Sequence, residues 1–334
     1  MSGRYTIVGA EMSPYSVKVR SYFRFKAIPH DWVVASAAVR ERYQPYFRIP
    51  VIPLLVTPDD EGLQDSTPII EALEAVLEHN PIHPRDPVAR FVSCLLEEFG
   101  DEWANKWMFH HRWAREVDQQ SAGTRIACVL DPDADKAARR EMVDKVIERM
   151  TGRVWFVGSN AQNAAQIESG FLTALARLNE HLANRPYLFG GRPAFADFGL
   201  SPQIYSAWTD PTAGALISAR FPNVLAWLQR MLWPRVETDF ESWPRLEPTL
   251  MPFLTEQVGA RFMPWTVANH DALRNGLDEF SVELAGATWT QKPQKYHAKS
   301  LKALGRKYMD ASDSGELDSV LERAGCRKHL EALA

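Results

Sequence analysis

Cysteine is scarce in this chain of 334 residues. Only Cys94, Cys128 and Cys326 occur, they lie far apart, and no CxxC pair is present. This spacing argues against a disulfide framework and against a metal site built from clustered thiolates. No run approaches the ~18 apolar residues that cross a bilayer, and the early apolar stretch "YTIVGA" is followed at once by Glu11. We therefore expect a protein of a reducing compartment, located in the cytoplasm and not in a membrane.

Excess positive charge is absent as well. The formal net charge is -4, whereas nucleic acids and anionic membranes are bound through concentrated Lys and Arg. Hydrophobic residues make up 46% and charged residues 24% of the chain, which is typical of a globular protein and not of a disordered one. The length is that of about two domains. We expect a small-molecule or protein partner, and no nucleic acid.

Strand and helix patterns alternate at the start of the chain. Short apolar runs predict four strands, at residues 5–9, 31–35, 53–57 and 62–64. A helix from Ser13-Pro14 separates the first two strands, which should therefore be parallel, and the turn "PDDEG" predicts an antiparallel hairpin between the last two. The stretch "AAVRERYQPYF" predicts a weaker, irregular helix, and Thr67 before Pro68 is a good N-cap for the next one. The expected order is βαβαββα around a mixed four-stranded sheet.

The pattern changes after the first eighty residues. "HNPIHPRDP" carries three prolines and predicts a linker, and five helix-length periodic segments then follow without a clear strand pair. The tail has scattered aromatics and two helical stretches, near 297–309 and 315–333. We expect four parts, at residues 1–80 (α/β domain), 81–87 (linker), 88–245 (all-helical domain) and 246–334 (C-terminal extension packed on the body).

Local motifs give this order of elements a family resemblance. "SPYS" (13–16) lies at the first strand-to-helix turn, "PVIPLL" (50–55) enters the third strand, and "QDSTPIIEAL" (64–73) opens the third helix. "RPYLFGGRPAFADFGL" follows in the helical region. Across roughly residues 5–210, the chain resembles the glutathione S-transferase family, in its serine-type, bacterial-like form. The resemblance implies an α/β thioredoxin-like N-terminal domain and an all-α C-terminal domain.

The resemblance also implies a site for glutathione as co-substrate. Ile52, before a cis Pro53, would pair through its main chain with the cysteinyl part of glutathione. Asp65 would hold the ammonium and Ser66 the carboxylate of the γ-glutamyl end. Ser13 would be the catalytic residue, donating a hydrogen bond to the glutathione sulfur. No metal is expected.

Each of these residues also has a purely structural interpretation. The residues alone favour an ordinary trans Pro53 that starts an edge strand, and the resemblance favours the cis form instead. Ser13 before Pro14 is a typical N-cap. Asp65 and Ser66 precede a helix N-terminus and can simply cap it. The free N–H groups and the dipole of that helix would attract a carboxylate in either case.

Two positions depart from the family pattern. Val51 stands where many members have a basic or amide group that grips the glycyl carboxylate, which lowers the expected affinity for glutathione. Ala194 stands where a Ser or Thr would cap the helix three residues before Asp197, and a missing cap typically costs about 0.5 to 2 kcal/mol.

A long helix predicted to open the second domain carries one polar face. This face comprises Glu98, Asp101, Glu102, Asn105 and Arg112, opposite Leu96, Phe99, Trp103 and Trp107. It is consistent with a polar wall for a second substrate, but a solvated face with i,i+4 charge pairs is the stronger interpretation.

Other candidate groups nearby receive little weight. His110 and His111 point about 100° apart on a helix, and no HxxxH spacing supports a metal site. Tyr5 and Tyr15 could each place a phenol near the site, although core packing is the more typical role for both.

Two function classes follow. The leading one is an enzyme that transfers alkyl or aryl groups to glutathione, acting on a small hydrophobic electrophile as a homodimer. The alternative is a glutathione-transferase-like fold that serves as a non-catalytic binding or interaction module. A glutaredoxin-like thiol oxidoreductase is disfavoured, because serines stand at both cysteine positions of a CPYC motif and no mixed disulfide can form there.

Overall fold

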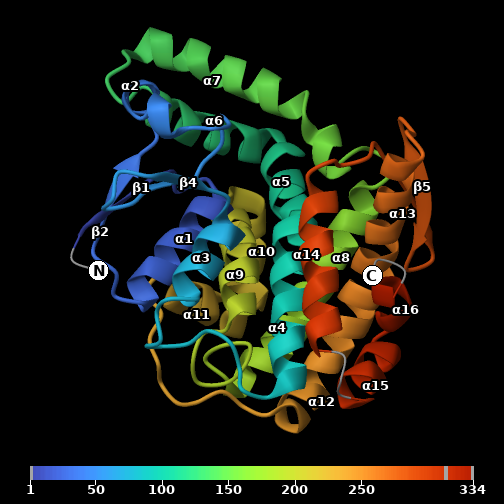
Figure 1. The fold of residues 1–334 in the computed structure, drawn as a ribbon. Coiled ribbons are helices and arrows are strands. Elements are labelled where there is room, and N and C mark those ends of the chain that lie inside the picture. The colour runs from blue at the N-terminus through green and yellow to red at the C-terminus, as the bar shows by residue number, and fades with distance from the viewer. Residues whose placement is uncertain (1–2, 312–314, 332–334) are drawn as a thin grey trace.

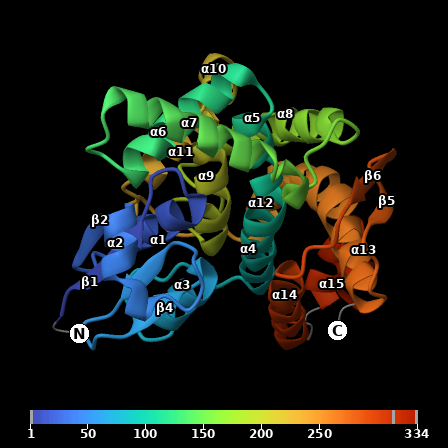
Figure 2. The ribbon, with the colours of Figure 1, turned by 90° about the horizontal axis from the view of Figure 1, so that it is seen from above.

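The computed structural model describes residues 3–311 and 315–331 and places a small α/β unit beside a large body of helices (Figure 1). Figure 2 shows helix α4 (Pro87–Phe99) between the α/β unit and the last helices of the chain. No helix in the described part of the chain combines the length and apolarity needed to cross a membrane.

The α/β unit contains a four-stranded mixed sheet. Its strands are β1 (Tyr5–Gly9), β2 (His30–Val34), β3 (Leu54–Val56) and β4 (Gly62–Gln64), in the order β2-β1-β3-β4. β1 pairs with β2 in parallel, whereas β3 pairs antiparallel with both β1 and β4. The predicted fold class, a thioredoxin-like domain followed by an all-α domain, is confirmed.

The helices of this unit begin close to the predicted positions. They are α1 (Pro14–Phe25), α2 (Ala37–Arg42), the short 3-10 helix η1 (Gln44–Tyr46) and α3 (Ser66–Glu74). The predicted start of α3 is wrong, because Ser66 is already helical and Asp65 holds the N-cap position in place of Thr67. The Thr67 hydroxyl instead takes part in a buried network, donating a hydrogen bond to Glu97 and accepting one from Lys18.

The helical body is built around α9 (Phe195–Trp208), which packs against both α1 and α4. Its other elements are the π-helical turn η2 (Gly100–Ala104), α5 (Asn105–Trp113), α6 (Glu116–Leu130), α7 (Lys136–Thr151), η3 (Val154–Val157), α8 (Ala164–His181), η4 (Leu182–Asn184), α10 (Pro211–Arg220) and α11 (Pro222–Met231). A Cβ atom at Gly100 would lie 2.6 Å from the main chain of Gly199, so the crossing of η2 and α9 requires glycine. Ala194 gives α9 no side-chain cap, and the Asp197 carboxylate instead accepts the Ala194 N–H at 2.8 Å.

The C-terminal extension has more structure than the sequence predicts. It forms one continuous helical rod, a β-hairpin and three further helices, namely α12 (Trp243–Phe253), the π-helical η5 (Leu254–Phe262), α13 (Met263–Arg274), β5 (Phe280–Leu284), β6 (Ala287–Gln291), α14 (His297–Ala311), α15 (Gly315–Arg323) and α16 (Arg327–Glu331). The predicted stretch at 297–309 corresponds to α14. The stretch at 315–333 divides into α15 and α16, and its last two residues lie outside the described ones. The rod and the hairpin were not predicted.

Aromatic side chains join the extension to the helical body. Trp265 and Trp289 are buried and lie 5.7 and 5.4 Å from Trp103 of η2, measured between ring centroids. Helix α14 packs on α4 (Figure 1). It also reaches the α/β unit, where Lys307 Nζ lies 2.5 Å from Glu71 Oε1 of α3. The extension therefore contacts both domains.

Candidate active site

The strand register brings the predicted glutathione residues to one edge of the sheet. Val8 pairs with Leu54, and Leu54 pairs with Gln64. The Ala10–Ser13 turn follows the end of β1, the Ile52-Pro53 bond precedes the start of β3, and the Asp65-Ser66 pair follows the end of β4. All three segments therefore meet at the same end of the sheet, beside the helical body.

Ser13 is the N-cap of α1. Its hydroxyl oxygen accepts the Ser16 N–H at 3.3 Å, and the side chain is partly exposed. The turn before it is held from the helical domain, because Arg112 Nη1 donates to the Met12 carbonyl at 2.9 Å. Arg112 is itself buried and paired with Asp210 at 2.8 Å. Ser13 thus lies on a fixed turn, with its hydroxyl at the positive end of a helix dipole.

The Ile52-Pro53 peptide bond is cis, as the resemblance implies. Pro53 is buried, whereas Val51 before the bond is 47% exposed. Within residues 3–311 and 315–331, the main-chain N–H and C=O of Ile52 make no hydrogen bond to protein. They are free to pair with an extended peptide.

Asp65 has an uncommon backbone conformation, with φ at 81°. Such a conformation costs a non-glycine residue about 1 to 3 kcal/mol and is found preferentially at binding and active sites. Its carboxylate makes no cap hydrogen bond with α3. Instead, the hydroxyl of Tyr296, from the C-terminal extension, donates to Asp65 Oδ2 at 2.5 Å. The extension therefore reaches the predicted γ-glutamyl position, next to the buried Ser66.

A pocket lies beside the loop that precedes Pro53. Its volume is about 370 Å³, and it is lined by Arg40, Gln44, Phe47, Arg48, Ile49 and Pro50. Two guanidinium groups thus lie near the segment where Val51 provides no polar side chain.

The polar helix face predicted between residues 98 and 112 is buried, so its interpretation as a solvated face is wrong. The exposed fraction is 9% or less at all five positions, Glu98, Asp101, Glu102, Asn105 and Arg112. The C-terminal extension and the α/β unit cover this face from two sides. The sequence did not predict the contacts of the extension, and helical periodicity alone could not show that this polar face is buried.

One side of this helix carries a compensated ion cluster. Lys18 of α1 is fully buried, and its Nζ lies 2.5 Å from Glu97 Oε1 and 2.6 Å from Asp101 Oδ2. Burial alone would lower the pKa of Lys18, but the two carboxylates raise it above its usual range. This cluster joins the α/β unit to the helical domain through one lysine between two carboxylates, and burial still raises the pKa of Asp101 to about 7 although Lys18 opposes it.

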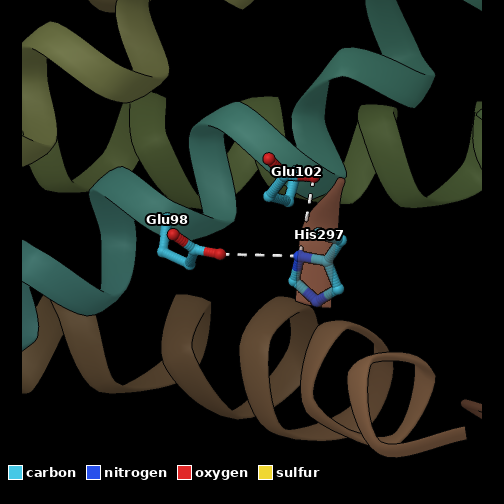
Figure 3. Close-up of side chains that lie close together, drawn as sticks. All are labelled: Glu98, Glu102 and His297. Atoms are coloured by element: carbon cyan, nitrogen blue, oxygen red, sulfur yellow. Dashed lines mark ion pairs between the residues drawn. The ribbon is translucent and has the colours of Figure 1, made fainter. Parts of the chain in front are cut away.

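The other side carries two acids that face a histidine (Figure 3). His297 Nδ1 lies 3.5 Å from both Glu98 Oε1 and Glu102 Oε2. The imidazole is fully buried, and its Nε2 is 3.0 Å from the Thr266 hydroxyl. Ser300, one turn further along α14, donates to Glu98 Oε1 at 2.6 Å.

Burial is the largest cause of the pKa shifts in this second cluster. Burial, followed by the charge of Glu102, raises the pKa of Glu98 to about 8. Burial also raises the pKa of Glu102 to about 7, although Lys106 opposes this, and lowers the pKa of Lys106 to about 7. Burial lowers the pKa of His297 to about 4. Each charged form is thus penalised, because no group in the cluster is fully paired.

The remaining candidates lie apart from these groups. His110 contacts Ser159 at 2.8 Å and Glu168 at 3.2 Å, whereas the His111 ring packs against the Phe171 ring at a tilt of 48°. Tyr5 is buried in the core, and the Tyr15 hydroxyl donates to the Asp101 carbonyl at 2.9 Å.

Sequence reasoning missed Lys18, Tyr296 and His297 as members of the site. Lys18 is one residue from the apolar stripe of α1, and only a contact with the second domain explains its burial. Tyr296 and His297 lie in the extension, for which no motif gave a position.

Comparison with known proteins identifies both domains. The glutathione S-transferase N-terminal domain matches residues 7–81, and the glutathione S-transferase C-terminal domain matches residues 136–230. Together these matches cover about half of the chain. No curated protein sequence matches it.

Solved structures with similar folds include three bacterial proteins. A glutathione S-transferase from Rhodospirillum rubrum F11 has 18% identity and a TM-score of 0.44, covering 75% of this chain and 92% of that one. A beta-etherase from Sphingobium sp. strain SYK-6 has 20% identity and a TM-score of 0.44, covering 69% and 95%. A glutathione-bound glutathione S-transferase from Methylobacillus flagellatus KT has 19% identity and a TM-score of 0.39, covering 68% and 94%. The two domain matches, and not these low scores, decide the assignment: the chain belongs to the glutathione S-transferase family.

Proposed function

We propose that this protein is a glutathione transferase that transfers alkyl or aryl groups from a small hydrophobic electrophile to glutathione. The observation that carries the proposal is the meeting of Ser13, Ile52-Pro53 and Asp65-Ser66 at one edge of the sheet, in a domain of this family. A fold kept only for interaction would not require these three segments to meet, with hydroxyl, carboxylate and, within the described residues, unpaired main-chain groups at one edge.

Binding would use the main chain of Ile52, which is free within the described residues, together with Ser66 and Asp65, the last of which already accepts a hydrogen bond from Tyr296. The main chain of Ile52 pairs with the cysteinyl part of glutathione, and Ser66 at the start of α3 receives the γ-glutamyl carboxylate. Asp65 receives the ammonium. Arg40 and Arg48 line the adjacent pocket and provide the positive charge for the glycyl carboxylate that Val51 cannot provide.

Catalysis would depend on the state of the glutathione sulfur. A free thiol has a pKa of about 8.5, so little thiolate exists at neutral pH. The Ser13 hydroxyl donates a hydrogen bond to the sulfur, and the dipole of α1 favours the negative charge, so the thiol releases its proton to solvent. The thiolate then attacks the electrophilic carbon, a carbon–sulfur bond forms, and the leaving group departs with the bonding electron pair.

The test is the pH dependence of conjugation by Ser13→Ala. A pKa reduced by about one unit raises the thiolate fraction about tenfold at neutral pH. We expect Ser13→Ala to be at least about tenfold slower than wild type near pH 7, with glutathione affinity nearly unchanged and the deficit shrinking above the free thiol pKa. Stopped-flow or steady-state rates with a panel of aryl and alkyl halides provide the measurement.

Ser36→Ala is the matched control. Ser36 caps α2 through the Val39 N–H at 3.3 Å, the same geometry as Ser13 on α1. Its loss should lower stability without the pH-dependent rate deficit. Superimposed pH profiles for Ser13→Ala and wild type would leave Ser13 as a cap only, and the hydroxyl would then be sought at Tyr15, Ser16 or Tyr5. Absence of glutathione binding at millimolar concentration by calorimetry would favour the non-catalytic binding or interaction module.

Two further expectations belong to this proposal. The protein acts in the cytoplasm, and it forms a homodimer. Light scattering after size-exclusion chromatography tests the assembly, since a constant mass near the 37.9 kDa of one chain would contradict a dimer.

A further inference from the structure

We propose that Glu98, Glu102 and His297 form a binding site for one divalent transition-metal cation, which fastens the C-terminal extension to the helical domain. The sequence alone led us to expect no metal. The three residues come from α4, η2 and α14, and this proposal does not depend on the transferase activity.

The first argument is geometric. One ligand atom from each residue can be chosen so that all three lie within 4.8 Å of one another. His297 Nδ1 lies 3.5 Å from an oxygen of each carboxylate. Two ligand atoms bound about 2.1 Å from a tetrahedral Zn²⁺ lie roughly 3.4 Å apart, so these separations suit a shared ion. Figure 3 shows both carboxylates directed toward the same edge of the imidazole.

The second argument is the unpaired nitrogen. Within residues 3–311 and 315–331, Nδ1 of His297 has no hydrogen-bond partner, although the ring is completely buried. A buried polar atom without a partner is costly, and native structures usually satisfy it with protein, water or an ion. The atom points at two acids, so a cation is the ligand that satisfies all three groups.

The surrounding residues fit this assignment. The Nε2 atom of His297 contacts the Thr266 hydroxyl at 3.0 Å, which leaves the Nδ1 lone pair for a metal when Nε2 carries the proton. Ser300 holds one oxygen of Glu98 at 2.6 Å. Histidine that binds metal commonly has its second nitrogen fixed in this way, and ligating carboxylates are commonly hydrogen-bonded as well.

Among the described residues, no lysine or arginine forms an ion pair with Glu98 or Glu102, although Lys106 acts on Glu102 from a greater distance. Lys106 is one helical turn from Glu102, but its Nζ lies 4.0 Å from the centroid of the Trp265 ring and has no hydrogen-bond partner among the described residues. Two carboxylates and one imidazole favour Zn²⁺ or Mn²⁺, because imidazole suits transition metals and carboxylate suits the harder ones. Mg²⁺ should bind weakly.

The ion would join sequence segments about two hundred residues apart. Glu98 and Glu102 belong to the domain that faces the α/β unit, and His297 is the first residue of α14. The preceding residue, Tyr296, contacts Asp65. An ion at this point therefore fixes the start of α14 beside the predicted glutathione site.

The experiment uses the full chain, treated with EDTA and transferred to chelator-free buffer. Titration calorimetry with ZnCl₂, MnCl₂ and MgCl₂, with metal analysis of the dialysed protein, should show one Zn²⁺ or Mn²⁺ per chain and little Mg²⁺. Glu102→Gln and His297→Gln should each weaken binding by about tenfold or more. Glu168→Gln is the matched control, because it removes a carboxylate 3.2 Å from another buried histidine, His110, and should leave binding unchanged.

Two outcomes would overturn the proposal. One is the absence of binding to the wild type at millimolar Zn²⁺ and Mn²⁺. The other is wild-type affinity in folded Glu98→Gln, Glu102→Gln and His297→Gln, with folding checked by circular dichroism. Should every variant unfold, Mn²⁺ added to the wild type decides: paramagnetic broadening of the His297 ring signals supports the site, and unbroadened signals from this ring contradict it.

Discussion

Two acid pairs lie on neighbouring faces of one helical segment, about 100° apart, and their surroundings in the fold differ. Glu97 and Asp101 face the α/β unit, where Lys18 Nζ lies 2.5 and 2.6 Å from their oxygens. Glu98 and Glu102 face the C-terminal extension, where among the described residues the one basic group within 4 Å of their oxygens is His297 at 3.5 Å. In both pairs the acids are buried and stand four positions apart. The first pair has a lysine in ion-pair contact, whereas Lys106 acts on Glu102 only from a greater distance.

This difference separates a structural role from a binding role. A buried carboxylate needs a cation or donors that replace water. Lys18 meets part of that need through two ion pairs and joins α1 to α4 and η2. The Glu98–Glu102 pair leaves it unmet, which is the arrangement expected where an external cation or proton completes the site.

The largest expected effect is the loss of Lys18. Lys18→Met leaves Glu97 and Asp101 buried without a counter-charge, and breaking a buried ion pair from one side typically costs about 3 to 5 kcal/mol. We expect the free energy of unfolding to fall by that amount in urea denaturation followed by circular dichroism.

Lys145→Met is the control for Lys18. Lys145 pairs with Glu141 at 2.6 Å on the exposed face of α7, and its loss should change the unfolding curve little. Adding Glu97→Gln and Asp101→Asn to Lys18→Met should restore part of the lost stability. An unfolding free energy unchanged by Lys18→Met would show that the first pair needs no cation and would break the comparison.

The second effect concerns Glu98 and Glu102, the pair without an ion-paired lysine. In EDTA, the double variant Glu98→Gln/Glu102→Gln should be as stable as wild type or more stable by about 1 to 2 kcal/mol, because two poorly compensated carboxylates disappear. Glu97→Gln in the same buffer should lower stability, since Lys18 loses a partner. Thermal and urea unfolding with EDTA measure both variants, and equal losses in the two would contradict the distinction.

How far the sequence predicts this fold differs between the two ends of the chain. The four strands, the parallel first pair, the antiparallel last pair and the turn at Ser13 follow from local signals: period-two apolar runs, a Ser-Pro turn and a short polar hairpin. The segments at Ile52-Pro53 and Asp65 were indicated by the family resemblance. Helical periodicity also locates α4 and α9. In these regions the local pattern and the tertiary packing agree, so the sequence alone locates the strands and helices.

The extension was predicted poorly for identifiable reasons. The rod from Trp243 to Arg274 contains four prolines, which are unfavourable inside helices, so its sequence does not show the pattern of a typical long helix. The hairpin turns at Ala285-Gly286, with φ of 49° and 84°. That conformation is typical of a type I′ turn, where Asn-Gly is the usual signal, so "VELAGATW" did not stand out.

The burial of Glu98 and Glu102 was also beyond local reasoning. A charged helix face is exposed in most proteins, and periodicity describes only the helix itself. The face is covered here by a segment about two hundred residues away. Only the tertiary contact of α14 distinguishes a buried acid pair from a solvated one.

The smallest expected effect concerns the contact between Tyr296 and Asp65, which depends on the proposed glutathione site. The Tyr296 hydroxyl donates to the carboxylate that the proposal assigns to the glutathione ammonium. Glutathione must therefore share or displace this hydrogen bond, whose net contribution is typically about 0.5 to 1.5 kcal/mol. Tyr296→Phe should tighten glutathione binding about two- to tenfold in calorimetry.

Tyr308→Phe controls for the loss of a phenol in the same part of the extension, since Tyr308 lies on α14 and Tyr296 directly precedes it. The Tyr308 hydroxyl donates to Asp318 at 2.9 Å, within the extension itself, so this variant should leave glutathione affinity unchanged. Weaker binding by Tyr296→Phe alone would assign Tyr296 to the glutathione site as a direct contact. Equal affinity in both variants and wild type would place the ammonium away from Asp65.

Tyr296 directly precedes His297, so the same titration in the presence of Zn²⁺ tests whether the Glu98–Glu102–His297 cluster acts on the proposed glutathione site. If Tyr296→Phe tightens glutathione binding more in the metal-loaded protein than in the metal-free protein, the ion holds the Tyr296 phenol against Asp65.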